Sequence, residues 1–99
     1  MPTEDKSAVS DEDLAIAVAR LEGWQHQGRA IVRRWALASF ADITRFMTHL
    51  AATIAATNHH PDVILCTVTR SVTVTVTTHS AGRVTRADLD FAAALNTFA

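Results

Sequence analysis

The chain has no tyrosine, a single cysteine, three glycines and two prolines among its 99 residues, and no excess of charge of either sign. The lone cysteine, Cys66, excludes an internal disulfide, so the fold must be stable without one. Nine basic and ten acidic side chains give a formal net charge of −1. That balance offers no broad electrostatic footprint for nucleic acid or for an anionic membrane, and we expect neither as a partner.

Long hydrophobic runs are also missing. No apolar stretch is long enough to cross a bilayer, and the first ten residues, MPTEDKSAVS, lack the apolar stretch of a signal peptide. We therefore expect a cytoplasmic protein. Hydrophobic residues make up 48% of the chain and charged residues 19%. In a chain of this length, that composition is enough for one hydrophobic core. We predict a flexible tail over residues 1–9 and one domain over residues 10–99.

Three segments have the pattern of helices. Each starts with a serine or threonine followed three residues later by an acid, which is typical of a helix N-terminus: Ser10 with Asp13, Ser39 with Asp42, and Thr85 with Asp88. The second segment has the clearest apolar stripe, made of Phe40, Ile43, Met47, Leu50 and Ile54, with Phe46 beside it. Asn58 tolerates the left-handed conformation of a helix end, and Pro61 prevents the helix from resuming.

Paired strand patterns lie between these helices. Gly28 marks a hairpin turn, and a later segment alternates with period two, so that Val72, Val74 and Val76 face one way and the threonines between them the other. The order α-β-β-α-β-β-α predicts a two-layer α+β domain, with three helices on one face of a four-stranded antiparallel sheet. The threonine-rich run VTVTVTT predicts an exposed edge that pairs with another chain, so we expect a homodimer, or a tetramer built from dimers.

Five histidines are the candidates for chemistry. His26 lies in a polar hairpin and His49 lies off the apolar stripe of its helix, and we interpret both as exposed. His59, His60 and His79 differ because they lie at the ends of a helix and of a strand, where side chains can converge on one cleft while the scaffold stays rigid.

Metal binding and nucleophilic catalysis find little support. Adjacent histidines splay apart, and Cys66 has no partner at ligand spacing, so we expect no metal site. Neither Cys66 nor Ser80 belongs to a nucleophile motif. General acid–base catalysis remains, because imidazoles exchange protons near neutral pH. Several histidines around one pocket suit a reaction without a covalent intermediate, such as a dehydration.

A purely structural interpretation stands beside the catalytic one. His59 and His60 can be residues that suit a helix C-terminus, where an imidazolium contributes roughly 0.3–1 kcal/mol. His79 can simply end a strand, and the presence of Asp88 is fully explained by a structural role as the third residue of a helix capping box. Spacing alone does not choose between the two.

The motif NHHPD after an alanine-rich helix, with TTH at the end of a later strand and AGRVTRADL following, resembles the pterin-4a-carbinolamine dehydratase family. The segments LEGW, FADITRFMTHLA and AGRVTRADLDFAAAL resemble the family's first-helix exit, second helix and closing helix. The resemblance covers nearly the whole chain after residue 9, so residues 10–99 resemble one dehydratase-like domain.

The resemblance implies an enzyme that removes water from a 4a-hydroxytetrahydropterin and gives the quinonoid dihydropterin, in the recycling of a tetrahydrobiopterin-type cofactor. The pterin is then the substrate, and no cofactor is implied. His60 and His79 would be the proton-transfer pair and His59 would orient the substrate. The residues implied in substrate binding are these four: Asn58, Pro61, Thr78 and Asp88.

Three departures from the family pattern favour an alternative. Ala55 stands where the family has a glutamate, no aromatic residue follows His-His-Pro in the next strand, and the stretch from Pro61 to His79 is about two residues longer than usual. They allow a weakened dehydratase, a pterin-binding protein without turnover, or a protein-binding relative of the kind that helps assemble Rubisco or acts as a dimerisation cofactor.

Overall fold

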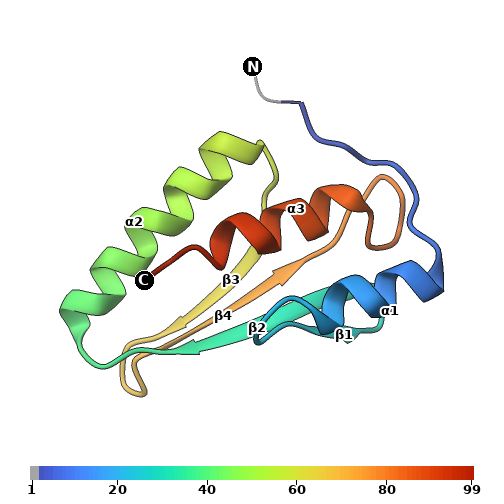
Figure 1. The fold of residues 1–99 in the computed structure, drawn as a ribbon. Helices are drawn as coiled ribbons and strands as arrows, with labels where there is room; N and C mark the ends of the chain where they lie inside the picture. Colours follow the sequence, from blue (N-terminus) through green and yellow to red (C-terminus); the bar gives the residue numbers. More distant parts are fainter. Residues whose placement is uncertain (1–2) are drawn as a thin grey trace.

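The computed structural model of the chain describes residues 3–99, in which three helices cover one face of a four-stranded sheet (Figure 1). The elements follow in the order α1 (Asp11–Ala19), β1 (Gln25–Gln27), β2 (Ala30–Ala36), α2 (Phe40–Thr57), β3 (Asp62–Cys66), β4 (Ser71–Val76) and α3 (Arg86–Leu95). The predicted α+β class and element order are confirmed. None of the helices in residues 3–99 combines the length and the apolar character needed to span a membrane.

The sheet has the strand order β1-β2-β4-β3, and every neighbouring pair is antiparallel. The prediction that the threonine-rich run forms an exposed edge is wrong, because β4 pairs with β2 on one side and with β3 on the other. The edge next to β4 is β3, where Ile64 is 70% exposed.

The core lies between the sheet and the helices. Val72, Val74 and Val76 are buried there, which confirms the predicted alternation. In α2 the buried line is made of four residues: Ile43, Phe46, Leu50 and Thr53. The predicted stripe is therefore wrong at its start, since Phe40 is 65% exposed at the first turn of the helix while Phe46 is fully buried.

An aromatic cluster joins α2 to the sheet and to the end of the chain. The ring of Phe46 lies 4.8 Å from that of Trp35 and 5.1 Å from that of Phe98, between centroids. His49 packs beside Phe98, and its Nε2 lies 3.1 Å from the carbonyl oxygen of Leu95. The expectation that His49 is exposed is wrong, because the end of α3 crosses α2 at this point and leaves the ring half-buried. His26 is exposed, as predicted.

The segment of residues 1–9 was expected to be a flexible tail, and its first two residues lie outside the described part of the chain. Residues 3–9 form no helix or strand. The segment nevertheless runs along the domain, since Val9 is buried in the core and the carbonyl oxygen of Ser7 accepts a hydrogen bond of 3.2 Å from the backbone N–H of Arg86.

Candidate functional site

The end of α2 places two adjacent histidines at different depths. Asn58 caps the helix in the left-handed conformation, with φ 56°, and its N–H donates to the carbonyl oxygen of Ile54 at 2.8 Å. The chain reverses there, and β3 starts one residue after Pro61. As a result His59 is buried, with 5% exposure, whereas His60 is exposed. The predicted helix end at Asn58 is confirmed.

The end of β4 brings the third histidine to the same place. Thr78 follows the strand, is buried and forms an isolated bridge with Arg83, which closes a turn that contains Gly82 at φ 66°. His79 lies in that turn and is exposed. A buried residue is therefore again followed by an exposed histidine.

One hollow of about 300 Å³ joins these two element ends. The residues that line it come from the N-terminal segment, the α2–β3 connection and the turn after β4: Glu4, Lys6, Asn58, His59, His60, Thr77, Thr78, His79 and Ser80. The structure thus brings together His59, His60 and His79, along with Asn58 and Thr78. Pro61 is half-buried in the connection and Asp88 lies beneath His59, and neither lines the hollow.

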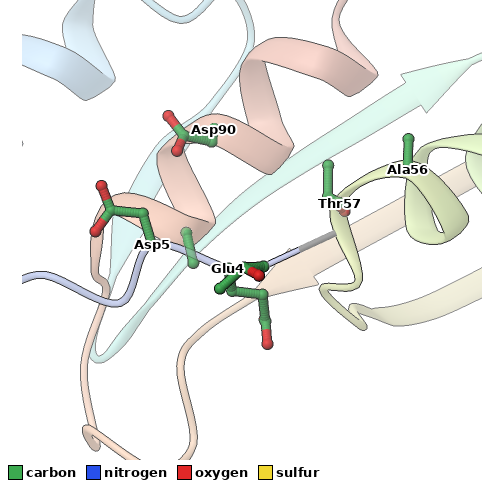
Figure 2. A pocket seen from close by; sticks show the side chains of 7 residues that line it. Glu4, Asp5, Ala56, Thr57 and Asp90 are labelled. Carbon is green, nitrogen blue, oxygen red and sulfur yellow. The ribbon is translucent and has the colours of Figure 1, made fainter. Parts of the chain in front are cut away.

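A second hollow of about 170 Å³ lies next to it, between the N-terminal segment, the end of α2 and the start of α3 (Figure 2). Glu4 lines both hollows. The smaller one is lined by Asp5 and Asp90 and by no histidine. Figure 2 shows Glu4 between the first turn of α3 and the α2 residues Ala56 and Thr57.

A buried hydrogen-bond network holds His59. Its Nε2 lies 2.5 Å from Oδ1 of Asp88, and its Nδ1 forms a hydrogen bond with Oε1 of Glu4. The other oxygen of Asp88 accepts from the hydroxyl of Thr78 and from the backbone N–H of Thr85, each at 2.8 Å. The cap formed by Thr85 and Asp88 is therefore present, and the same carboxylate also anchors a histidine.

The network sets the charge of His59. The hydrogen bond to Asp88, followed by the one to Glu4, outweighs the effect of burial and raises the pKa of His59 above its ordinary value of 6.5. Ionised carboxylates only accept hydrogen bonds, so both bonds form at once only when the ring is doubly protonated. The network therefore favours the imidazolium form of His59, and both of its ring nitrogens already have carboxylate partners.

The other two histidines are differently placed. Within residues 3–99, no side chain or carbonyl group forms a hydrogen bond with the ring of His60 or His79, and both are exposed. They can therefore exchange protons with a molecule in the hollow or with water. Also within residues 3–99, no group of three or more His, Cys, Asp or Glu side chains is placed to hold a metal ion.

Sequence reasoning missed Glu4, Lys6, Thr77 and Ser80 as residues of the hollow. Thr77 and Ser80 flank the predicted Thr78 and His79, so their position along the chain could have indicated them. Glu4 and Lys6 had no such signal, because they belong to a polar segment that reads as a tail.

Comparison with known proteins places the chain in a family. The family model described as pterin 4 alpha carbinolamine dehydratase matches residues 7–98, and the chain belongs to this family. A protein of Koribacter versatilis (strain Ellin345) named "Putative pterin-4-alpha-carbinolamine dehydratase" is 34% identical over 88 residues, covering 89% of this chain and 92% of that protein. One of the same name from Rhodopseudomonas palustris (strain HaA2) is 40% identical over 85 residues, covering 84% and 82%.

Two solved structures are similar in fold. The transcriptional coactivator/pterin dehydratase from Brucella melitensis is 28% identical and aligns with a TM-score of 0.85 over 94% of this chain and 99% of that one. A pterin dehydratase-like protein identified as a RuBisCO assembly factor in the alpha-carboxysome is 26% identical, with a TM-score of 0.60 over 76% of this chain and 84% of that one. The family resemblance inferred from the NHHPD and TTH motifs is confirmed.

Proposed function

We propose that the protein catalyses the dehydration of a 4a-hydroxytetrahydropterin to the quinonoid dihydropterin by histidine general acid–base catalysis. The observation that carries the proposal is the arrangement of three histidines around one hollow, in which His59 is locked and His60 and His79 are exposed. Family membership supports the reaction type.

The proposed chemistry needs one acid and one base. The imidazolium of one exposed histidine donates a proton to the leaving hydroxyl group, the carbon–oxygen bond breaks and water departs. The neutral imidazole of the other accepts a proton from a ring N–H, and a carbon–nitrogen double bond forms. Because His60 and His79 are both exposed, water can return each to its starting state.

The remaining residues of the site bind and shape it in this proposal. Asn58 and Thr78 contact the substrate from the walls of the hollow. Pro61 stiffens the turn that carries the two adjacent histidines. Asp88 does not reach the substrate and acts on it indirectly, by holding His59 in place. A hollow of about 300 Å³ is at the lower end of the range for small-molecule sites. The pterin is the substrate, so we propose that no cofactor is needed.

A stopped-flow assay with synthetic pterin carbinolamine tests the proposal. We expect the wild-type protein to accelerate the loss of water over buffer, and His60→Ala to reduce the rate by about 10²–10⁴-fold, the usual range for a general acid or base. His26→Ala is the matched control, since His26 is exposed and lies outside the hollow. A wild-type rate equal to that of buffer would refute the enzyme function.

A second candidate function is protein binding without catalysis. The fold similarity to the RuBisCO assembly factor and the presence of Ala55, exposed on α2, in place of the family's glutamate favour it. Calorimetry of pterin binding, together with the stopped-flow assay, separates the candidates. Binding with turnover supports the dehydratase, and binding without turnover supports a pterin-binding protein. The absence of pterin binding, together with a protein partner captured by pull-down, supports an assembly factor.

We also propose that the protein acts as a homodimer or a tetramer in the cytoplasm, without nucleic acid. The edge strand β3 supports self-association, because Ile64 and Leu65 are 70% and 41% exposed there and one side of the strand has no neighbour within residues 3–99. Such an edge pairs readily with another chain.

A further inference from the structure

The N-terminal segment reaches the hollow along a fixed path. Val9 is buried in the core, and its carbonyl oxygen accepts a hydrogen bond of 2.9 Å from Arg83. Two residues earlier, the carbonyl oxygen of Ser7 accepts from the backbone N–H of Arg86 at 3.2 Å, at the start of α3. These contacts direct the residues before Ser7 towards the end of α2.

Glu4 makes the last contact on this path. One carboxylate oxygen accepts a hydrogen bond from Nδ1 of His59, and the other lies 3.6 Å from Nζ of Lys6. The side chain of Glu4 is only 16% exposed, so the pair it forms with His59 is largely withdrawn from water. Interactions between charges are stronger in such a place than on the open surface.

The charges around His59 balance. Glu4 and Asp88 each contribute −1, and the imidazolium and the ammonium of Lys6 each contribute +1. The cluster therefore supplies no net charge to the hollow. Its effect is geometric, because a ring that donates to carboxylates from both nitrogens can neither rotate nor give up a proton without breaking a charged hydrogen bond.

We propose that Glu4 is a positioning residue of the site, which together with Asp88 clamps the ring of His59 and makes the N-terminal segment one wall of the pocket. The clamp keeps His59 as a rigid part of that wall and leaves proton transfer to His60 and His79. The effect on the reaction rests on the proposed dehydratase function, whereas the clamp itself does not.

Glu4→Gln tests the clamp, with Asp5→Asn as the matched control. Both variants remove one negative charge from the same segment, but Asp5 is exposed and accepts a hydrogen bond from the backbone N–H of Ser7 rather than from His59. In the protein without pterin, a histidine titration followed by NMR is expected to give a lower pKa for His59 in Glu4→Gln and an unchanged one in Asp5→Asn. A pKa for His59 that is the same in Glu4→Gln and the wild type would overturn the proposal.

The effect on the reaction is measured separately with pterin carbinolamine. We expect Glu4→Gln to lower kcat/KM by about tenfold, the scale of one charge-assisted hydrogen bond, and Glu4→Asp to retain more activity because it keeps the charge. An active protein whose kcat/KM is unaffected by Glu4→Gln would also overturn the proposal. If the wild type is inactive, the dehydratase function fails, and the NMR titration still decides whether Glu4 clamps His59.

Discussion

Asp88 contacts the edge of the His59 ring, with 2.5 Å between Oδ1 of the carboxylate and Nε2 of the ring. The same buried carboxylate accepts hydrogen bonds from Thr78, after β4, and from the backbone of Thr85, before α3. One side chain thus fastens three element ends around the hollow. Removing it affects stability as well as the site.

We predict that Asp88→Ala lowers the free energy of unfolding by about 3–5 kcal/mol, because it leaves a buried imidazolium without its main partner. Urea unfolding followed by circular dichroism measures the change. Asp90→Ala is the control on the same helix, since Asp90 is exposed and a surface change of this kind typically shifts stability by no more than ~0.5 kcal/mol. Equal stabilities for the two variants would contradict the anchoring role of Asp88.

We also predict that stability depends on pH through His59. The hydrogen bonds to Asp88 and Glu4 raise the pKa of this ring above 6.5, so at pH values between 6.5 and the raised pKa the folded state binds more protons than the unfolded one. The contribution of His59 is complete below 6.5, and it is lost as the pH rises through the pKa of the folded state. The unfolding free energy is therefore expected to fall over that interval.

Urea unfolding at a series of pH values, in the wild type and in His59→Gln, measures this dependence. The variant lacks the titrating ring, so its stability should vary less with pH over the same interval. Identical slopes in the two proteins would show that another group is responsible.

Two phenylalanines of α2 offer a matched test of the core. We predict that Phe46→Ala lowers the free energy of unfolding by about 3–5 kcal/mol, because its fully buried ring packs against Trp35 and Phe98. Phe40→Ala should change it by no more than ~0.5 kcal/mol, because that side chain is 65% exposed. Thermal or urea unfolding measures the loss of stability in both variants. A larger loss of unfolding free energy for Phe40→Ala than for Phe46→Ala would contradict the packing of α2.

The edge strand β3 gives a prediction about self-association. Light scattering should show a dimer or tetramer for the wild type and a monomer for Ile64→Lys, because a lysine on an edge strand discourages pairing with another chain. Ile16→Lys is the control, since Ile16 is 52% exposed on α1 and lies away from this edge. A wild-type protein that is monomeric at tens of micromolar concentration would rule out the assembly.

Local patterns in the sequence predicted the elements well. The alternation of Val72, Val74 and Val76 gave a strand with one buried face, and Asn58 marked the end of α2, because both signals depend only on neighbours along the chain. The same patterns failed for strand order, since the threonine-rich run lies at the centre of the sheet. Which strand becomes an edge depends on pairings between distant segments.

The candidate site was likewise predictable from the sequence only in part. The motifs indicated His59, His60 and His79, and the structure places all three at one hollow. The family resemblance also assigned His59 a different role from His60 and His79, but the contact between His59 and Glu4 was not visible, because Glu4 lies 55 residues before His59 in the chain. Spacing cannot predict a partner that reaches the site through a segment without helix or strand.

The path of residues 3–10 also affects how the domain can be joined to other polypeptides. A fusion tag placed ahead of Thr3 leaves the protein beside Glu4 and the mouth of the pocket. The opposite terminus lies against Arg45, near the start of α2 (Figure 1), and the helix from there to Asn58 is roughly 20 Å long. Tags on the carboxyl side therefore leave access to the pocket unobstructed.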